Sequence, residues 1–197
     1  MEQYLETIRI EEGRACHLPY HNQRMNETRA HLGLSDGLDL EAVIGDVSIY
    51  QQRTRCRIVY DTEIRSVEFF PYQIKSVKTL RLVEDNQVDY GCKYADRSAL
   101  NRCFAQRGAC DDVLIVQNGD VTDTTIANVA FWNGETWFTP STPLLKGTMR
   151  ASLLDSHQIQ EAKIRVEDLS HFSRLRLFNA MISFGEIELP IQSVLAV

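Results

Sequence analysis

The sequence has no long apolar run. Nothing in its 197 residues approaches the roughly 18 to 20 consecutive apolar residues that a membrane-spanning helix requires. The first residues, MEQYLETIRIEEGR, contain no basic stretch followed by an apolar one, which a secretory signal peptide would show. We therefore expect a cytoplasmic protein without a membrane partner.

Several common site motifs are also missing. There is no phosphate-binding G-x-x-x-x-G-K-[ST] loop and no G-x-G-x-x-G dinucleotide signature. The five cysteines form no C-x-x-C pair, so we expect reduced thiols and no metal site. Basic residues are outnumbered, 21 Lys and Arg against 27 Asp and Glu, and a net charge of −6 argues against nucleic acid as a partner.

What is present is typical of a soluble α+β protein. Strand-like runs flank the Glu11-Glu12-Gly13 turn and recur at 54–60, 65–70 and 75–84. Helical patterns cover 20–34, 39–50, a stretch around Leu100 to Phe104, and 148–157. Strands and helices do not alternate regularly along the chain, as they would in a doubly wound parallel sheet, and this favours an α+β fold.

The second half contains two hairpin signals, Asn118-Gly119 and Asn133-Gly134, because both residue types tolerate the positive φ of a tight turn. A polar connector covers residues 84–92. We therefore predict two domains, 1–85 and a larger one over 86–197.

Two features could carry chemistry in the second half. Lys93 follows Gly91-Cys92 and precedes the helix near Leu100, although helix entries favour acidic rather than cationic residues. A lysine can act as a covalent nucleophile in a suitable pocket, yet most lysines are simply solvated. Asp123 lies in VTDTTIANVAF, where it could hold a protonated ring nitrogen or form an ordinary Asx turn.

Two further features could bind a phosphate. In LLKGTMR, the chain enters a helix after Gly147, and backbone N–H groups at a helix N-terminus suit an anion. In HNQRM, His21 and Arg24 are three residues apart on one helix face, and arginine offers a fork of donors to phosphate oxygens. Taken alone, each feature fits a structural role better: Gly147 as the residue between a loop and a helix, and His21 with Arg24 as a surface pair.

Together these features are the set that pyridoxal phosphate requires, and the chain resembles the class IV aminotransferases, the fold-type IV family. That family includes branched-chain and D-amino-acid aminotransferases and 4-amino-4-deoxychorismate lyase. The resemblance runs in order through these segments: LETIRIEEGRACHLPYHNQRM, KYADRSALN, DDVLIVQNGDVTDTTIANVAF, TPSTPLLKGTMR and NAM.

The resemblance implies two α+β domains with the cofactor in a cleft between them, and a homodimer. Lys93 would bind the cofactor and move the substrate's proton. The implied cofactor-binding residues are Arg24, Lys93, Asp123, Thr148, Met149 and Asn179. We expect a lyase that eliminates pyruvate from 4-amino-4-deoxychorismate, a small amino-acid-like substrate. An aminotransferase for D- or branched-chain amino acids and a non-catalytic family member are the alternatives.

Two departures from the family pattern concern the cofactor and the substrate. Asp123 stands where the family usually has Glu, so its carboxylate reaches one methylene less far. The segment that precedes the first strand in full-length relatives is not found before LETIRI. Arg57, which shares a strand face with Arg55, is the candidate for binding the substrate carboxylate, although both could simply line a polar strand face.

Overall fold

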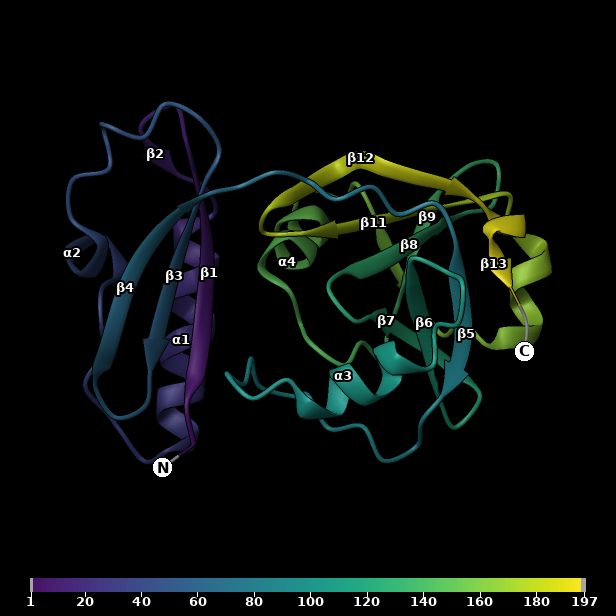
Figure 1. The fold of residues 1–197 in the computed structure, drawn as a ribbon, viewed down its shortest axis with the longest axis horizontal. Helices are drawn as coiled ribbons and strands as arrows, with labels where there is room; N and C mark the ends of the chain where they lie inside the picture. Colours follow the sequence, from purple (N-terminus) through teal and green to yellow (C-terminus); the bar gives the residue numbers. More distant parts are fainter. Residues whose placement is uncertain (1, 196–197) are drawn as a thin grey trace. The chain divides into compact units, whose positions relative to one another are not determined.

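The structure is a computed structural model and describes residues 2–195. Contacts divide the chain into two compact units (Figure 1). The N-terminal unit runs to Ile74 and includes Cys92–Asp96, and the C-terminal unit contains Lys75–Gly91 and the chain from Arg97 onward. No helix within residues 2–195 has the length and apolar character needed to cross a membrane.

The N-terminal unit is an antiparallel sheet with strand order β2-β1-β3-β4. Residues Ile8 and Ile10 of β1 pack with Met25 of α1, because alternate strand side chains share one face. The elements are β1 (Tyr4–Glu11), β2 (Arg14–Ala15), α1 (Leu18–His31), α2 (Leu40–Ile44), β3 (Thr54–Tyr60) and β4 (Ile64–Pro71).

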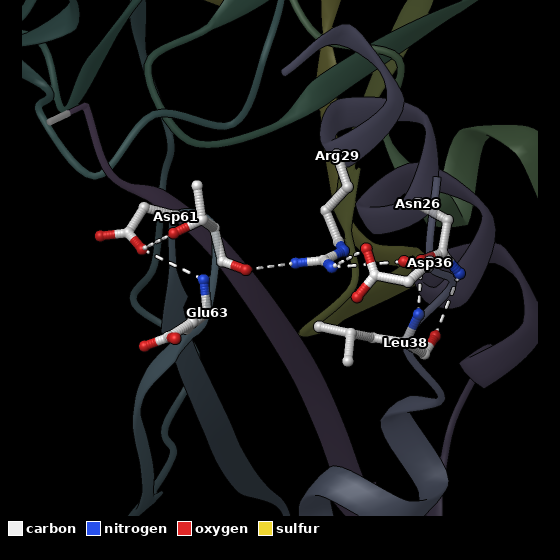
Figure 2. A network of polar contacts seen from close by, with 7 residues as sticks. Asn26, Arg29, Asp36, Leu38, Asp61 and Glu63 are labelled. Atoms are coloured by element: carbon white, nitrogen blue, oxygen red, sulfur yellow. Dashed lines mark hydrogen bonds and ion pairs between the residues drawn. The ribbon is translucent and has the colours of Figure 1, made fainter. Parts of the chain in front are cut away.

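The C-terminal end of α1 is fixed by a network of polar contacts (Figure 2). Arg29, only 2% exposed, donates to the carbonyl of Thr62 at 2.8 Å and to the Asp36 carboxylate at 3.0 Å. Asn26 exchanges two hydrogen bonds with the backbone of Leu38, at 2.9 and 3.0 Å. These hydrogen bonds offset the cost of burying the guanidinium, although its Nε has no acceptor within residues 2–195, and they hold α1 against the β3–β4 turn.

The C-terminal unit contains two sheets, with strand orders β13-β5-β6-β7 and β10-β9-β8-β11-β12. The strands are β5 (Leu80–Glu84), β6 (Asp112–Gln117), β7 (Asp120–Thr124), β8 (Asn128–Trp132), β9 (Trp137–Pro140), β10 (Gln160–Ala162), β11 (Arg174–Asn179), β12 (Ile182–Pro190) and β13 (Val194–Leu195). The helices are α3 (Ser98–Ala105), α4 (Thr148–Asp155), and the 3₁₀ helices η1 (Val166–His171) and η2 (Ile191–Ser193).

The chain passes from one sheet to the other between β7 and β8, and this crossing positions the site. Asp123 lies at the end of β7 and Asn128 at the start of β8. Helix α4 lies beside the second sheet (Figure 1). Its Met149 and Leu153 belong to an apolar cluster that includes Phe178. The N-terminus of α4 is thereby held by apolar packing.

The α+β fold predicted from the sequence is confirmed. Both predicted hairpins form, and Asn118 and Gly119 have φ values of 53° and 80°, as a tight turn between β6 and β7 requires. Two elements are shorter than expected. The strand expected over 75–84 begins only at Leu80, where it pairs with Asp112, and the helix expected over 39–50 is only α2, which ends at Gly45 with a φ of 67°.

The compact units differ from the predicted division at two places. Strand β5, expected in the N-terminal domain, pairs in parallel with β6 and so belongs to the C-terminal unit. The lysine segment, expected in the C-terminal domain, belongs to the N-terminal unit, because the Leu5 N–H donates to the Lys93 carbonyl and Tyr94 forms a bridge with Tyr4.

Candidate active site

The N-terminal unit holds a buried cluster of charged side chains between β1 and α1. Glu6 has no exposed surface and accepts two hydrogen bonds from Arg24, at 2.9 and 2.6 Å. The Nδ1 atom of His21 lies 2.5 Å from Oε2 of Glu6, the same oxygen that accepts the 2.6 Å hydrogen bond from Arg24. His21 and Arg24 therefore point to the same place, as their spacing on the helix predicts, and a carboxylate fixes both.

The charges and hydrogen bonds around Glu6 favour its ionised form. Burial would raise the pKa of Glu6, but the charge of Arg24 and the hydrogen bonds from His21 and Arg24 outweigh it and lower the pKa to about 2. Burial also lowers the pKa of His21, with the charges of Arg24 and Lys93 acting in the same direction against the pull of Glu6. The cluster thus presents Arg24 as an oriented cation.

Lys93 lies beside this cluster in the same unit. Its backbone is held to the N-terminal end of β1, with the Leu5 N–H donating to its carbonyl oxygen at 2.8 Å and Ala95 bonding to Gln3 at 2.7 Å. The side chain is half-buried, and its charge acts on His21. The segment before α3 therefore presents the lysine from a fixed stretch of backbone rather than from a solvated loop.

The C-terminal unit contains a second group, centred on the buried carboxylate of Asp123. Its Oδ1 accepts from Asn128 Nδ2 at 2.8 Å, and its Oδ2 accepts from the Leu145 N–H at 3.0 Å. Burial raises the pKa of Asp123 to about 6, although both hydrogen bonds oppose this shift. The carboxylate is therefore oriented on both oxygens and ready to be neutralised by a nearby cation.

Asn128 connects Asp123 to the loop that enters α4. Its Nδ2 also donates to the Leu145 carbonyl at 2.8 Å, and its Oδ1 lies against Gly147 so closely that a Cβ there would be 2.1 Å away. Gly147 is the N-cap of α4, and the first helical residues, Thr148 and Met149, are both buried. One amide side chain thus positions both the carboxylate and a helix N-terminus that suits an anion.

The model of the family described as amino-transferase class IV matches residues 3–189. The chain belongs to the class IV aminotransferase family. This confirms the family, and the PLP-dependent enzyme class with it, that the sequence motifs predict.

Two relatives and one solved structure align with most of this chain. An uncharacterised protein of Haemophilus influenzae is 40% identical over 180 residues, covering 89% of this chain and 96% of the other. A protein of Schizosaccharomyces pombe named "Putative aminodeoxychorismate lyase" is 31% identical over 184 residues, covering 83% and 79%. The crystal structure of a "putative 4-amino-4-deoxychorismate lyase" from Haemophilus somnus is 35% identical, with a TM-score of 0.88 and coverage of 93% and 98%.

Pyridoxal phosphate is the cofactor of this family, and the residues present fit it. A buried, oriented carboxylate such as Asp123 suits a ring nitrogen that must stay protonated. The α4 N-terminus offers backbone N–H groups to a phosphate, and Gly147 lets the loop approach Asn128 closely. Arg24 is oriented by Glu6 as a cation, which suits a phosphate oxygen.

The contact at Gly147 gives a stability prediction. Gly147→Ala should lower the free energy of unfolding by about 1–3 kcal/mol, since Asn128 is tied at its amide nitrogen and cannot move aside freely. Urea denaturation measures the loss. Gly37→Ala is the matched control, because a Cβ there meets only Asn26, at 3.9 Å.

A second substitution tests the cause. If the alanine methyl acts by displacing Asn128, Gly147→Ala should cost less in an Asn128→Ala background than in the natural chain. Equal costs in the two backgrounds would contradict the role given to this contact.

Two other predicted site residues already have polar partners. Asn179 donates to the Ile126 carbonyl at 2.8 Å and accepts from the backbone N–H groups of Met181 and Ile182. Arg57 pairs with Glu68 on the neighbouring strand at 2.9 Å. Their expected roles toward phosphate and substrate carboxylate stay predictions.

Glu6 is a side chain of the cluster with His21 and Arg24 that the sequence motifs did not predict. It lies in the alternation Glu6, Ile8, Ile10, so the sequence places an acid on the same strand face as two apolar residues. An acid on a buried face needs a cationic partner. That pattern, with Arg24 on the covering helix, was a signal for the cluster.

Proposed function

We propose that this chain is a pyridoxal-phosphate enzyme that eliminates pyruvate from 4-amino-4-deoxychorismate and releases 4-aminobenzoate. The observation that carries the proposal is the likeness to the Haemophilus somnus protein, 35% identical over nearly all of both chains and named for this activity. The Schizosaccharomyces pombe relative, named for the same activity, also supports it. Fold and family alone would fit an aminotransferase equally well.

We assign the binding residues as follows. Arg24 and the backbone N–H groups of Thr148 and Met149 hold the phosphate, with the Asn179 amide beside them. Asp123 accepts a hydrogen bond from the ring nitrogen and keeps it protonated, while Asn128 and the Leu145 N–H hold the carboxylate in place. When bound, pyridoxal phosphate supplies an aldehyde and an electron-accepting ring.

Lys93 is the residue that we assign to proton transfer. Its amine removes the proton from the ring carbon that carries the substrate's amino group. The bond between the ring and the enolpyruvyl oxygen then breaks, the six-membered ring becomes aromatic, and the protonated lysine returns a proton to the leaving enolpyruvate. The products, 4-aminobenzoate and pyruvate, contain every atom of the substrate, so the reaction needs no oxidant and no water.

A lyase needs no keto-acid acceptor and an aminotransferase does, so an assay with and without keto acid distinguishes them. The purified, cofactor-loaded protein should release pyruvate from 4-amino-4-deoxychorismate with no keto acid added, and pyruvate should equal 4-aminobenzoate in amount. Turnover that depends on 2-oxoglutarate or pyruvate as acceptor would overturn the lyase in favour of an aminotransferase. A protein that binds no added cofactor and turns over neither substrate would be the non-catalytic family member.

We also propose that the enzyme works in the cytoplasm as a homodimer. The family resemblance supports the dimer, and the lack of a membrane-spanning helix within residues 2–195 is consistent with the location. Sedimentation or light scattering on the purified protein measures its oligomeric state.

A further inference from the structure

The turn between β7 and β8, residues 125–127, joins the two sheets of the C-terminal unit. We call it the β7–β8 turn. Asp123 lies before it on one sheet and Asn128 follows it on the other, so the 2.8 Å hydrogen bond between their side chains connects the two sheets. The position of the turn therefore determines how these two side chains meet.

Hydrogen bonds with Thr124 close the base of the turn. The Thr124 N–H donates to the Ala127 carbonyl at 2.9 Å, and the Thr124 hydroxyl oxygen accepts from the Ala127 N–H at 3.0 Å and from the Ile126 N–H at 3.3 Å. The carbonyls of Thr125 and Ile126, at the tip, accept from side chains outside the turn.

These outside contacts come from both sheets. Asn179, at the end of β11 in the second sheet, donates to the Ile126 carbonyl at 2.8 Å. Arg97 precedes α3, which contacts β6 of the first sheet, and donates to the Thr125 carbonyl at 2.7 Å. The Thr125 hydroxyl donates to Asp112, the first residue of β6, at 2.7 Å. The tip is thus held by its backbone and by one side chain.

The role of Arg97 in its own helix does not explain this contact. Arg97 is the N-cap residue of α3, a position that favours short polar side chains, and it makes no side-chain capping bond there. Within residues 2–195 its half-buried guanidinium has no carboxylate at ion-pair distance. Thr125 is only 4% exposed, and a buried carbonyl requires a donor. Arg97 is the donor that meets this requirement.

We propose that Arg97 is a positioning residue, whose hydrogen bond to the Thr125 carbonyl fixes the β7–β8 turn and thereby the contact between Asn128 and the Asp123 carboxylate. Its importance for turnover rests on the proposed function, which gives Asp123 its role at the cofactor ring. The anchoring of the turn stands on the C-terminal unit alone.

Kinetics on the cofactor-loaded protein test the effect on Asp123. Arg97→Ala should lower the turnover number for pyruvate release about tenfold or more, because a shifted turn misplaces the carboxylate, while KM should change less than about twofold. Arg97→Lys keeps an N–H donor for the carbonyl and should recover most of the turnover number. Arg102→Ala, which removes an exposed arginine from the same helix, is the matched control and should have the natural turnover number.

A second background distinguishes positioning from a general structural role. If Arg97 acts through the carboxylate, Arg97→Ala should lower the turnover number much less in an Asp123→Asn background than in the natural chain. Equal losses in the two backgrounds would overturn the proposal, as would a higher KM with an unchanged turnover number.

Hydrogen exchange on the cofactor-free protein tests the anchor without catalysis. The amides of Ile126 and Ala127 should exchange about tenfold faster in Arg97→Ala than in the natural protein or in Arg102→Ala. Exchange at the natural rate would contradict the anchoring role. If Arg97→Ala does not fold, as judged by circular dichroism, Arg97→Met takes its place, since methionine keeps an apolar stem and has no donor.

Exchange and turnover together distinguish a failure of this proposal from a failure of the proposed function. Faster exchange in Arg97→Ala, in a protein that never releases pyruvate, would retain the anchor and remove the proposed function. Natural exchange and natural turnover in Arg97→Ala, in a protein that does release pyruvate, would do the reverse.

Discussion

Replacing Lys93 by alanine should lower the turnover number for pyruvate release at least about a thousand-fold, because the assigned proton acceptor and donor is lost. The fold should survive, since Lys93 is half-buried and its contact with Leu5 is made by the backbone, which alanine keeps. Pyruvate release, coupled to lactate dehydrogenase, measures the turnover number. Borohydride reduction followed by peptide mass analysis measures covalent attachment of the cofactor at residue 93, which the variant should lose.

Two control variants separate the loss of a proton-transferring amine from the loss of a positive charge. Lys163→Ala removes a mostly exposed lysine that lies near Asp120 and should leave turnover unchanged. Lys93→Arg keeps a positive charge next to His21 but offers no amine that can transfer a proton near neutral pH, so it should be as inactive as the alanine variant. Substantial activity in either Lys93 variant would remove this residue from the mechanism.

The sequence predicted much of the secondary structure because the strands alternate and the turns contain strong signals. The alternation of Arg55 and Arg57 with buried Cys56 and Ile58 gave the bounds of β3, and Asn118-Gly119 gave the β6–β7 hairpin. Strand β5 was assigned to the wrong compact unit because its partner, β6, lies about thirty residues further along the chain. Such pairings leave no local signal in a sequence.

The sequence predicted which residue types the candidate site contains, but not which atoms contact one another. Arg24 and His21 share a helix face by spacing alone. The alternation in β1 signals that Glu6 needs a cationic partner, but which helix residues reach it depends on how α1 lies over β1. The same holds for Leu145, which contributes a backbone N–H to Asp123 and therefore carries no side-chain signal.

Asp123 is where the second large effect is expected. Asp123→Asn has nearly the same size but no charge, so it cannot stabilise a protonated ring nitrogen. We expect the turnover number to fall by about 10²- to 10³-fold, a magnitude typical of removing one oriented electrostatic group from an active site. Cofactor content should stay near that of the natural protein, because the phosphate contacts are elsewhere. Steady-state kinetics and the absorbance of the bound cofactor measure the two quantities.

The pKa of Asp123 predicts that activity falls on the acid side of the pH profile. Because burial raises the pKa of Asp123 to about 6, the carboxylate is mostly ionised at pH 7 and becomes neutral as the pH falls through 6. A cationic ring beside it favours the ionised form, so the acid-side loss of activity should lie at or below pH 6. Asp123→Asn should lack this loss.

Two further variants serve as controls for Asp123. Asp46→Asn, in an exposed loop, should keep the full turnover number. Asp123→Glu retains the charge and should be more active than the asparagine variant, although its extra methylene in a buried site should lower the free energy of unfolding by about 1–3 kcal/mol. Natural turnover in Asp123→Asn, with the acid-side loss still present, would mean that another group holds the ring nitrogen.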